Sequence, residues 1–275
     1  MELDYKGMIQ MLDIAEGDVI DVVSDLISVS AYCKKRGLDF DPDKLIDTLI
    51  EQVGSNGTIL IRTFTWDYCR GKTFDIRHSP GKVGVLGNVA MRRGDFQRTK
   101  HPLYSWMVWG AQQSELCAME NKSSFGKNTP FDFLSRSDAK QVTIGNCSTV
   151  GCTQIHHCEA MAEVPYRAEK VFEGTYIDAE GQVFQRRYSM FVRPLNLDVS
   201  HSVIEYPLFT QRMKEAGILR MARYDGMLDL KTYSLRMMTE YMIHHLRDED
   251  GSLMVSINGL PGYKAANVDW SGLRF

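Results

Sequence analysis

The sequence has no hydrophobic run long enough to cross a membrane. A transmembrane helix needs roughly 20 consecutive apolar residues, and polar or charged residues interrupt every apolar stretch of this 275-residue chain before that length. The first ten residues, MELDYKGMIQ, also lack the basic segment followed by an apolar segment that marks a secretory signal peptide. We therefore expect a cytoplasmic protein without a membrane partner.

The chain also has little excess of charge of either sign. Its 32 Lys and Arg residues are nearly balanced by 35 Asp and Glu residues, which gives a formal net charge of −3 and a pI near 6.2. A surface that coats nucleic acid is usually strongly basic. We therefore expect no nucleic-acid partner.

Cysteine is scarce, and so are signs of separate domains. Six cysteines in a chain of this length are too few for a disulfide scaffold, and a core of this size can be stabilised by burial alone. No repeat of fixed period, low-complexity tract or long linker rich in Pro, Gly or Ser interrupts the sequence. We expect one domain over residues 1–275.

Common signatures of α/β enzymes are missing as well. No G-x-G-x-x-G follows the first expected strand, and no G-x-S-x-G is present. Gly126-Lys127 resembles a P-loop only superficially, because Asn121 and Asn128 occupy the positions of its first Gly and its Ser or Thr. We therefore do not expect a dinucleotide-binding enzyme, a P-loop NTPase or an α/β serine hydrolase.

A strand, helix, strand order is present near the N-terminus. Residues 18–23 and 58–64 are rich in β-branched residues, although Asp21 interrupts the first of these strands. Between them, Asp41-Pro42 supplies an N-cap and a proline in the first turn of a helix that ends at residue 53. This order is typical of an α/β fold with helices on the faces of a sheet.

Other segments predict that the sheet is mixed. We expect a hairpin, because turn residues at 176–181 separate two arms of strand character. A last long helix is expected to begin after Asp229 and to end near Arg247. The remaining predicted elements are a first helix at 5–12, strands at 105–109 and 141–144, helices at 114–119 and 153–162, and hairpin arms at 170–176 and 182–192.

The strongest local candidate for chemistry is His156 with Glu159. On a helix these residues stand at i and i+3 and share one face. A carboxylate beside an imidazole holds its tautomer and raises its basicity, as a general base requires. The alternative is a weak surface pair with no catalytic role.

A zinc site is a second interpretation of the same region. Cys147, Cys152, His156 and Cys158 offer soft ligands within twelve residues. Structural zinc sites usually take paired ligands such as C-x2-C, and no second pair exists in the chain. We therefore expect no bound metal and interpret the cysteines as buried thiols.

A basic segment precedes the strand expected at 105–109. Arg92, Arg93, Arg98 and Lys100 place four cations within nine residues. Clustered cations beside hydroxyls and free backbone amides suit a polyphosphate such as the 3′-phospho-ADP end of coenzyme A. The alternative is a solvated loop.

Taken in order along the chain, these segments resemble the aminoglycoside 3-N-acetyltransferase family, which is distinct from the GNAT acetyltransferases. The resemblance covers roughly residues 4–250. It is carried by Gly17-Asp-Val with Ser24, Val53-Gly54 to Gly57-Thr58, Phe64-Thr65, Phe74-Asp75, Gly84, Arg92, Arg98-Thr-Lys-His101-Pro102 with Ser105, Gly110, Phe125-Gly126, Thr129-Pro130, Ile144-Gly145, Thr153 to His156 with Glu159, and Pro165-Tyr-Arg167.

The resemblance implies a three-layer α/β/α fold with a mixed sheet, and acetyl transfer from acetyl-CoA to an amino group of an amino sugar. The family's L-H-x-x-E motif corresponds to Ile155-His156-His157-Cys158-Glu159, so His156 would be the base and Glu159 its partner. The acceptor would be an aminoglycoside or a nucleotide-linked amino sugar used for surface polysaccharides. Antibiotic resistance is one implied role, and a homodimer is one possible assembly.

The resemblance also implies binding residues. The family's R-S-x-H-P-x-x-S segment lies at the CoA site. Its counterparts here are Arg98, Thr99, Lys100, His101 and Ser105, with threonine in place of the first serine.

Backbone amides near Ser24 are candidates for stabilising the oxyanion. For a cationic acceptor we expect the carboxylates of Asp67 and Asp75 to contribute, and His157, which stands beside the base, is a further expected substrate-binding residue.

The chain departs from the family pattern at two places. The family commonly has V-H-S-S-L at the end of its first strand, whereas this chain has Val22-Val23-Ser24-Asp25-Leu26. Residues 252–275 have no recognised counterpart and form a C-terminal extension of unknown role. A CoA-binding protein that has lost catalysis is therefore an alternative function.

Overall fold

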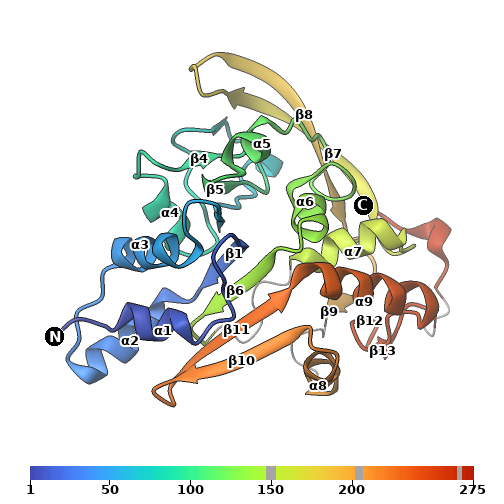
Figure 1. Ribbon diagram of the computed structural model, residues 1–275. Coiled ribbons are helices and arrows are strands. Elements are labelled where there is room, and N and C mark those ends of the chain that lie inside the picture. Colours follow the sequence, from blue (N-terminus) through green and yellow to red (C-terminus); the bar gives the residue numbers. More distant parts are fainter. Residues whose placement is uncertain (147–152, 202–206, 265–267) are drawn as a thin grey trace.

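The computed structural model describes residues 1–146, 153–201, 207–264 and 268–275 (Figure 1). A seven-stranded sheet has the order β10-β11-β6-β1-β2-β5-β4. In that order, the strands span Leu219–Tyr224, Leu228–Ser234, Lys140–Ile144, Val19–Ser24, Thr58–Arg62, Trp106–Gly110 and Gln97–Arg98. β6, β1 and β2 are parallel, and the other neighbouring pairs are antiparallel. The prediction of a mixed sheet is confirmed.

Helices cover both faces of this sheet (Figure 1). One face carries α1 (Tyr5–Gln10), α2 (Leu26–Arg36), α3 (Pro42–Val53) and α4 (Leu86–Ala90). The other carries α5 (Gln113–Ala118), α6 (Pro130–Arg136), α7 (Gln154–Ala162) and α9 (Leu235–Asp248). Because successive strand side chains point to opposite faces, Ile59 and Ile61 pack with the first set and Leu60 with the second. The predicted α/β/α layering is confirmed.

The remaining elements lie around this sheet. β7 (Ala168–Ile177) and β8 (Val183–Val192) form the predicted hairpin, which extends away from the central sheet (Figure 1). β3 (Phe74–Asp75) joins β7 in parallel. A small sheet consists of β9 (Val199–His201), β12 (Val255–Ile257) and β13 (Leu260–Pro261). The remaining helices are α8 (Pro207–Glu215), which contacts β10, and the 3-10 turns Tyr68–Arg70 and Trp270–Gly272.

α3 shows how local sequence fixes an element. The Asp41 side chain accepts a hydrogen bond from the amide of Asp43 at 2.9 Å, and Pro42 occupies the first turn. One face of the helix is then buried at helical spacing, by Leu45, Ile46, Leu49 and Val53. The helix prediction at 41–53 is confirmed.

One expectation about an element is wrong, and one helix was not expected. The helix expected to begin after Asp229 begins only at Leu235, because residues 228–234 form β11 between β6 and β10. The Ser234 hydroxyl caps the helix by accepting from the amide of Met237. α2 was not expected at all, although the Asp25 carboxylate caps it by accepting from two backbone amides.

In the part of the chain that the structure describes, no helix is both long and apolar enough to span a bilayer.

Candidate active site

A cavity of about 450 Å³ lies where the parallel strands β1 and β2 end. Ser24 at the end of β1, Arg62 at the end of β2 and His156 on α7 all line it. An aromatic wall consists of Phe64, Trp66 and Tyr104. Ligands of open α/β sheets bind at the carboxyl ends of the strands, so this cavity is the candidate substrate site.

Val83, Gly84, Leu86 and Gly87 form another part of the cavity wall. Gly87 lies so close to β2 that an added Cβ would stand 2.2 Å from the carbonyl oxygen of Arg62. Gly84 has a φ of +84°, a conformation that favours glycine. Gly87 allows α4 to approach β2, and both glycines line the cavity.

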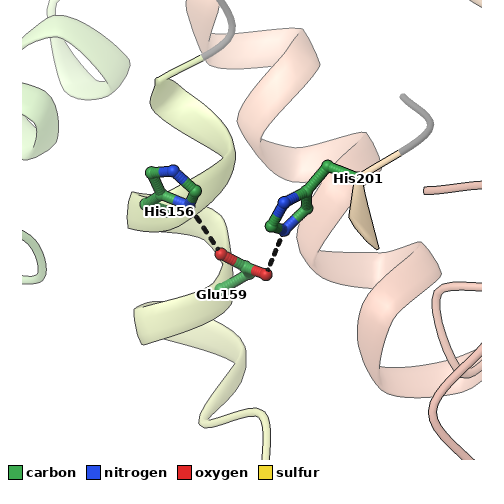
Figure 2. Close-up of side chains that lie close together, drawn as sticks. All are labelled: His156, Glu159 and His201. Carbon is green, nitrogen blue, oxygen red and sulfur yellow. Dashed lines mark hydrogen bonds and ion pairs between the residues drawn. The ribbon is translucent and has the colours of Figure 1, made fainter. Parts of the chain in front are cut away.

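His156 and Glu159 meet on one face of α7, as their spacing predicts. The His156 Nδ1 lies 2.8 Å from the Glu159 Oε2 (Figure 2). A carboxylate accepts, so this contact places the ring proton on Nδ1. Nε2 is then the nitrogen with a lone pair, on a ring that lines the cavity and is 25% exposed.

Glu159 is fully buried and has four partners. Its Oε2 faces His156 and forms an ion pair with the Arg167 Nε at 2.7 Å. Its Oε1 accepts from the Tyr166 hydroxyl at 2.9 Å and lies 2.7 Å from the His201 Nε2 (Figure 2). Burial alone would raise the pKa of Glu159, but His201, Arg167 and His156 outweigh it and hold that pKa well below its ordinary value. The carboxylate is therefore ionised at neutral pH.

Burial has the opposite consequence for the base. It lowers the pKa of His156 to about 4, because the charged imidazolium loses solvation, and the hydrogen bond to Glu159 only partly opposes this. At neutral pH the ring is therefore neutral, with its one proton on Nδ1. It can take a proton from a bound group without first losing one.

The same three side chains are also a candidate metal cluster. Ligand atoms of His156, Glu159 and His201 all lie within 4.8 Å of one another. However, the Glu159 oxygens also contact Arg167 and Tyr166, and a guanidinium beside a ligand opposes a metal cation. The contacts fit a hydrogen-bond network better than a metal site.

The sequence profile of the family described as aminoglycoside 3-N-acetyltransferase matches residues 24–247, which is most of the chain. The chain belongs to this family. Membership confirms the predicted resemblance and makes the protein an acyltransferase. A comparison with curated protein sequences gives no match.

Solved structures of aminoglycoside acetyltransferases share the fold. AAC-IIIb in a binary complex with CoASH is 20% identical with a TM-score of 0.75, over 89% of this chain and 95% of that chain. AAC-VIa bound to sisomicin is 19% identical with a TM-score of 0.70, over 90% and 97%. AAC(3)-Xa is 20% identical with a TM-score of 0.69, over 89% and 91%.

This acetyltransferase departs from its family's pattern within the cavity wall. Val23 lines the cavity where the family commonly has histidine, so an apolar group replaces an imidazole. Asp25 replaces a serine, and its carboxylate accepts from the amides of Ile27 and Ser28 at 3.1 and 3.2 Å. The substituted acid thus serves as the N-cap of α2. Ser24, between the two changes, lines the cavity.

The other cofactor-binding residues implied by the resemblance lie inside the acetyltransferase fold. Arg98 is buried and donates to the Ser105 hydroxyl at 3.0 Å and to the backbone oxygens of Ser79 and Thr63 at 2.5 and 3.0 Å. The buried Thr99 hydroxyl accepts from the amide of Trp106 at 3.0 Å. These groups bond to the protein itself and do not line the cavity of His156.

His101 and Lys100 in the same segment also have protein partners. The amides of Leu103 and Tyr104 both donate to the His101 Nδ1 at 3.3 Å, and burial lowers the pKa of His101 to about 3. Lys100 forms a surface ion pair with Glu120. The segment holds the aromatic wall in place through Tyr104, which does line the cavity.

The predicted acceptor-binding residues do not meet at this cavity. Asp67 is paired with Lys82 at 2.6 Å and Lys72 at 3.3 Å. Asp75, which ends β3, is paired with Arg77 and His78.

His157, on the buried side of α7, accepts from the amide of Gly126 at 3.3 Å, and burial lowers its pKa to about 4.

The predicted thiol cluster is only partly described. Cys147 and Cys152 lie outside the described residues. Cys158 is buried in the core, with its Sγ 3.8 Å from the Met242 Sδ.

Sequence reasoning missed a buried ion pair beneath the cavity. Asp21, which interrupts the first strand, pairs with Arg62 on the neighbouring strand. The Trp106 indole donates to the Asp21 Oδ1 at 2.9 Å, and Arg62 donates to the Gln141 Oε1 at 2.9 Å. An acid in one buried strand and a base in the next is the signal that could have predicted this pair.

Proposed function

We propose that the protein transfers the acetyl group of acetyl-CoA to an amino group of an aminoglycoside, with His156 as general base. The observation that carries this proposal is the neutral His156 at the cavity, bonded through Nδ1 to the buried Glu159. Membership of the family supplies the reaction class. AAC-VIa, which shares the fold, is bound to sisomicin, and this supports an aminoglycoside as acceptor.

The proposed reaction is a direct transfer. The acceptor nitrogen attacks the thioester carbonyl carbon, and His156 Nε2 takes the proton that this nitrogen loses as the N–C bond forms. The C–S bond then breaks, and CoA leaves as a thiolate that takes this proton from His156, which restores the neutral ring. Glu159, held ionised by its partners, stabilises the imidazolium that forms in between.

We place the thioester beside Ser24. Ser24, Gly84 and Gly87 line the cavity, and their backbone amides are the candidates to face the developing oxyanion. The acceptor then approaches from the aromatic wall of Phe64, Trp66 and Tyr104, whose faces suit the apolar side of a sugar ring and its ammonium groups.

An assay of thiol release from acetyl-CoA tests this function. The acceptors are a panel of aminoglycosides and a panel of nucleotide-linked amino sugars. We expect turnover with an aminoglycoside. Turnover with nucleotide-linked amino sugars alone would contradict the proposed acceptor, and CoA binding without turnover on either panel would indicate a protein that has lost catalysis.

A pair of neighbouring histidines tests the base. His156→Gln should lower kcat by about 10²–10⁴-fold, the usual contribution of a general base. The matched control is His157→Gln, because His157 bonds to backbone inside the core; it should lower stability while the folded protein keeps its turnover. Undiminished turnover in His156→Gln would rule out the proposed base.

A further inference from the structure

His201 reaches Glu159 from a distant part of the chain. It ends β9, beyond the long β7–β8 hairpin, and β9 pairs with β12 so that His201 stands opposite Val255. Val255 belongs to the segment after residue 252, beyond the part of the chain that matches the family. The C-terminal segment therefore holds the strand that carries His201 to the carboxylate (Figure 2).

We propose that His201 is a positioning residue for the general base, which acts by fixing the Glu159 carboxylate and by limiting how strongly that carboxylate attracts a proton to His156. This inference rests on the proposed role of His156. It assigns a function to His201, which lies outside the family's L-H-x-x-E motif. It also gives the C-terminal segment the role of supporting His201.

The geometry divides the carboxylate between two pairs of partners. Oε2 contacts His156 and Arg167, whereas Oε1 contacts His201 and Tyr166. The terminal torsion of a glutamate is soft, so contacts on both oxygens are needed to keep Oε2 aimed at the His156 Nδ1. Without His201, Tyr166 alone would hold Oε1, at a carboxylate that has no exposed surface.

The charges around the carboxylate give the sign of the effect on His156. The titratable and charged groups that face the Glu159 carboxylate are His156 on α7, Tyr166 and Arg167 in the following segment, and His201 on β9. Arg167 Nη2 also lies 3.4 Å from the His201 Nε2. Glu159 raises the pKa of His156 while Arg167 and His201 lower it. Loss of His201 therefore raises the proton affinity of His156.

The experiment compares His201→Phe with His201→Gln, in which an amide can still donate to Glu159. The proton affinity of His156 is measured by proton NMR titration of its ring, which does not depend on turnover. We expect the midpoint to rise in His201→Phe, and the acid limb of the pH profile of kcat/KM to move the same way. The control is His244→Phe, at an exposed histidine of α9, which should change neither.

Turnover separates positioning from folding. In His201→Phe we expect kcat to fall about tenfold with the acceptor KM nearly unchanged, because a hydrogen bond to a charged group is lost. His201→Gln should retain most of the turnover. An unchanged His156 midpoint in His201→Phe, or equal losses in both variants, would overturn the proposal.

Two other results would lead to different conclusions. Stoichiometric zinc in the purified protein, lost in both His201 variants, would also overturn the proposal in favour of a metal site. Full turnover in His156→Gln would instead refute the proposed base, whatever the NMR titration shows.

Discussion

The two histidine-bearing motifs of this chain, at residues 98–105 and 155–159, differ in where their polar groups find partners. Arg98 and His101 bond almost entirely to backbone groups and to a neighbouring serine. His156 bonds instead to a carboxylate that three other side chains hold, and its ring lines a cavity. A polar motif that satisfies the backbone organises the fold, whereas one that leaves a ring nitrogen at a cavity can do chemistry.

Burial alone does not separate the two motifs. It lowers the pKa of His101 to about 3 and that of His156 to about 4, so both rings are neutral at pH 7. A perturbed pKa is thus a feature of structural as well as of catalytic groups. Access to the cavity makes the difference.

Acid should weaken the fold through both motifs, and this is the largest effect we expect. The contribution of each neutral ring to the free energy of unfolding is fully present above the ordinary histidine pKa of 6.5. It is lost as the pH falls toward about 4 for His156 and about 3 for His101. In that range the unfolded chain binds the protons, so each ring steepens the pH dependence by up to about 1.4 kcal/mol per pH unit. Urea unfolding at pH 4 to 7 measures this.

Variants show whether these rings cause the acid sensitivity. His101→Asn keeps an acceptor near the amides of Leu103 and Tyr104, and His156→Gln removes the base. Each should flatten the dependence of the unfolding free energy on pH, and only His156→Gln should reduce turnover at pH 7. Slopes parallel to that of the wild type would contradict the assignment of the lowered pKa values.

Arg98→Met tests whether the first motif is structural. The change leaves the buried backbone oxygen of Thr63 and the partly buried one of Ser79 without this donor, so we expect the unfolding free energy to fall by about 3 kcal/mol. The folded protein should keep its kcat/KM. Arg92→Met, an exposed position in the same basic segment, is the control and should change stability by no more than about 0.5 kcal/mol. A rise in the KM for acetyl-CoA without loss of stability would instead support a cofactor contact at Arg98.

Local signals predicted much of the fold because they act within one element. The N-cap and helical spacing at 41–53 and the turn at 176–181 each specify their element without help from the rest of the chain. β11 was missed although it alternates between buried and partly buried residues and pairs with the nearby β10 as well as with the distant β6. The signal of the helix that follows it was extended too far toward the N-terminus.

The site, like the fold, was predictable only where the residues in contact lie close together in sequence. His156 and Glu159 share a helical turn, so their spacing sufficed. Arg62 pairs with Asp21 across two strands, and His201 reaches Glu159 from 42 residues away. Neither contact leaves a periodic signal, and the sequence therefore showed the base and its partner but not the groups that hold the partner.

Lys100→Ala has the smallest expected effect. It tests whether the motif at residues 98–105 is structural or contacts the cofactor. Lys100 lies at the surface, pairs with Glu120 and lines a separate cavity of about 540 Å³, with Tyr176 and Arg186. A surface ion pair contributes about 0–1 kcal/mol, so the unfolding free energy should change by less than that. We expect the KM for acetyl-CoA to stay within about twofold, since the loss of a solvated charge pair costs little. A much larger rise that weakens with added salt would show that the cofactor's phosphates reach Lys100, because salt screens exposed charges, and would make the first motif a binding site after all.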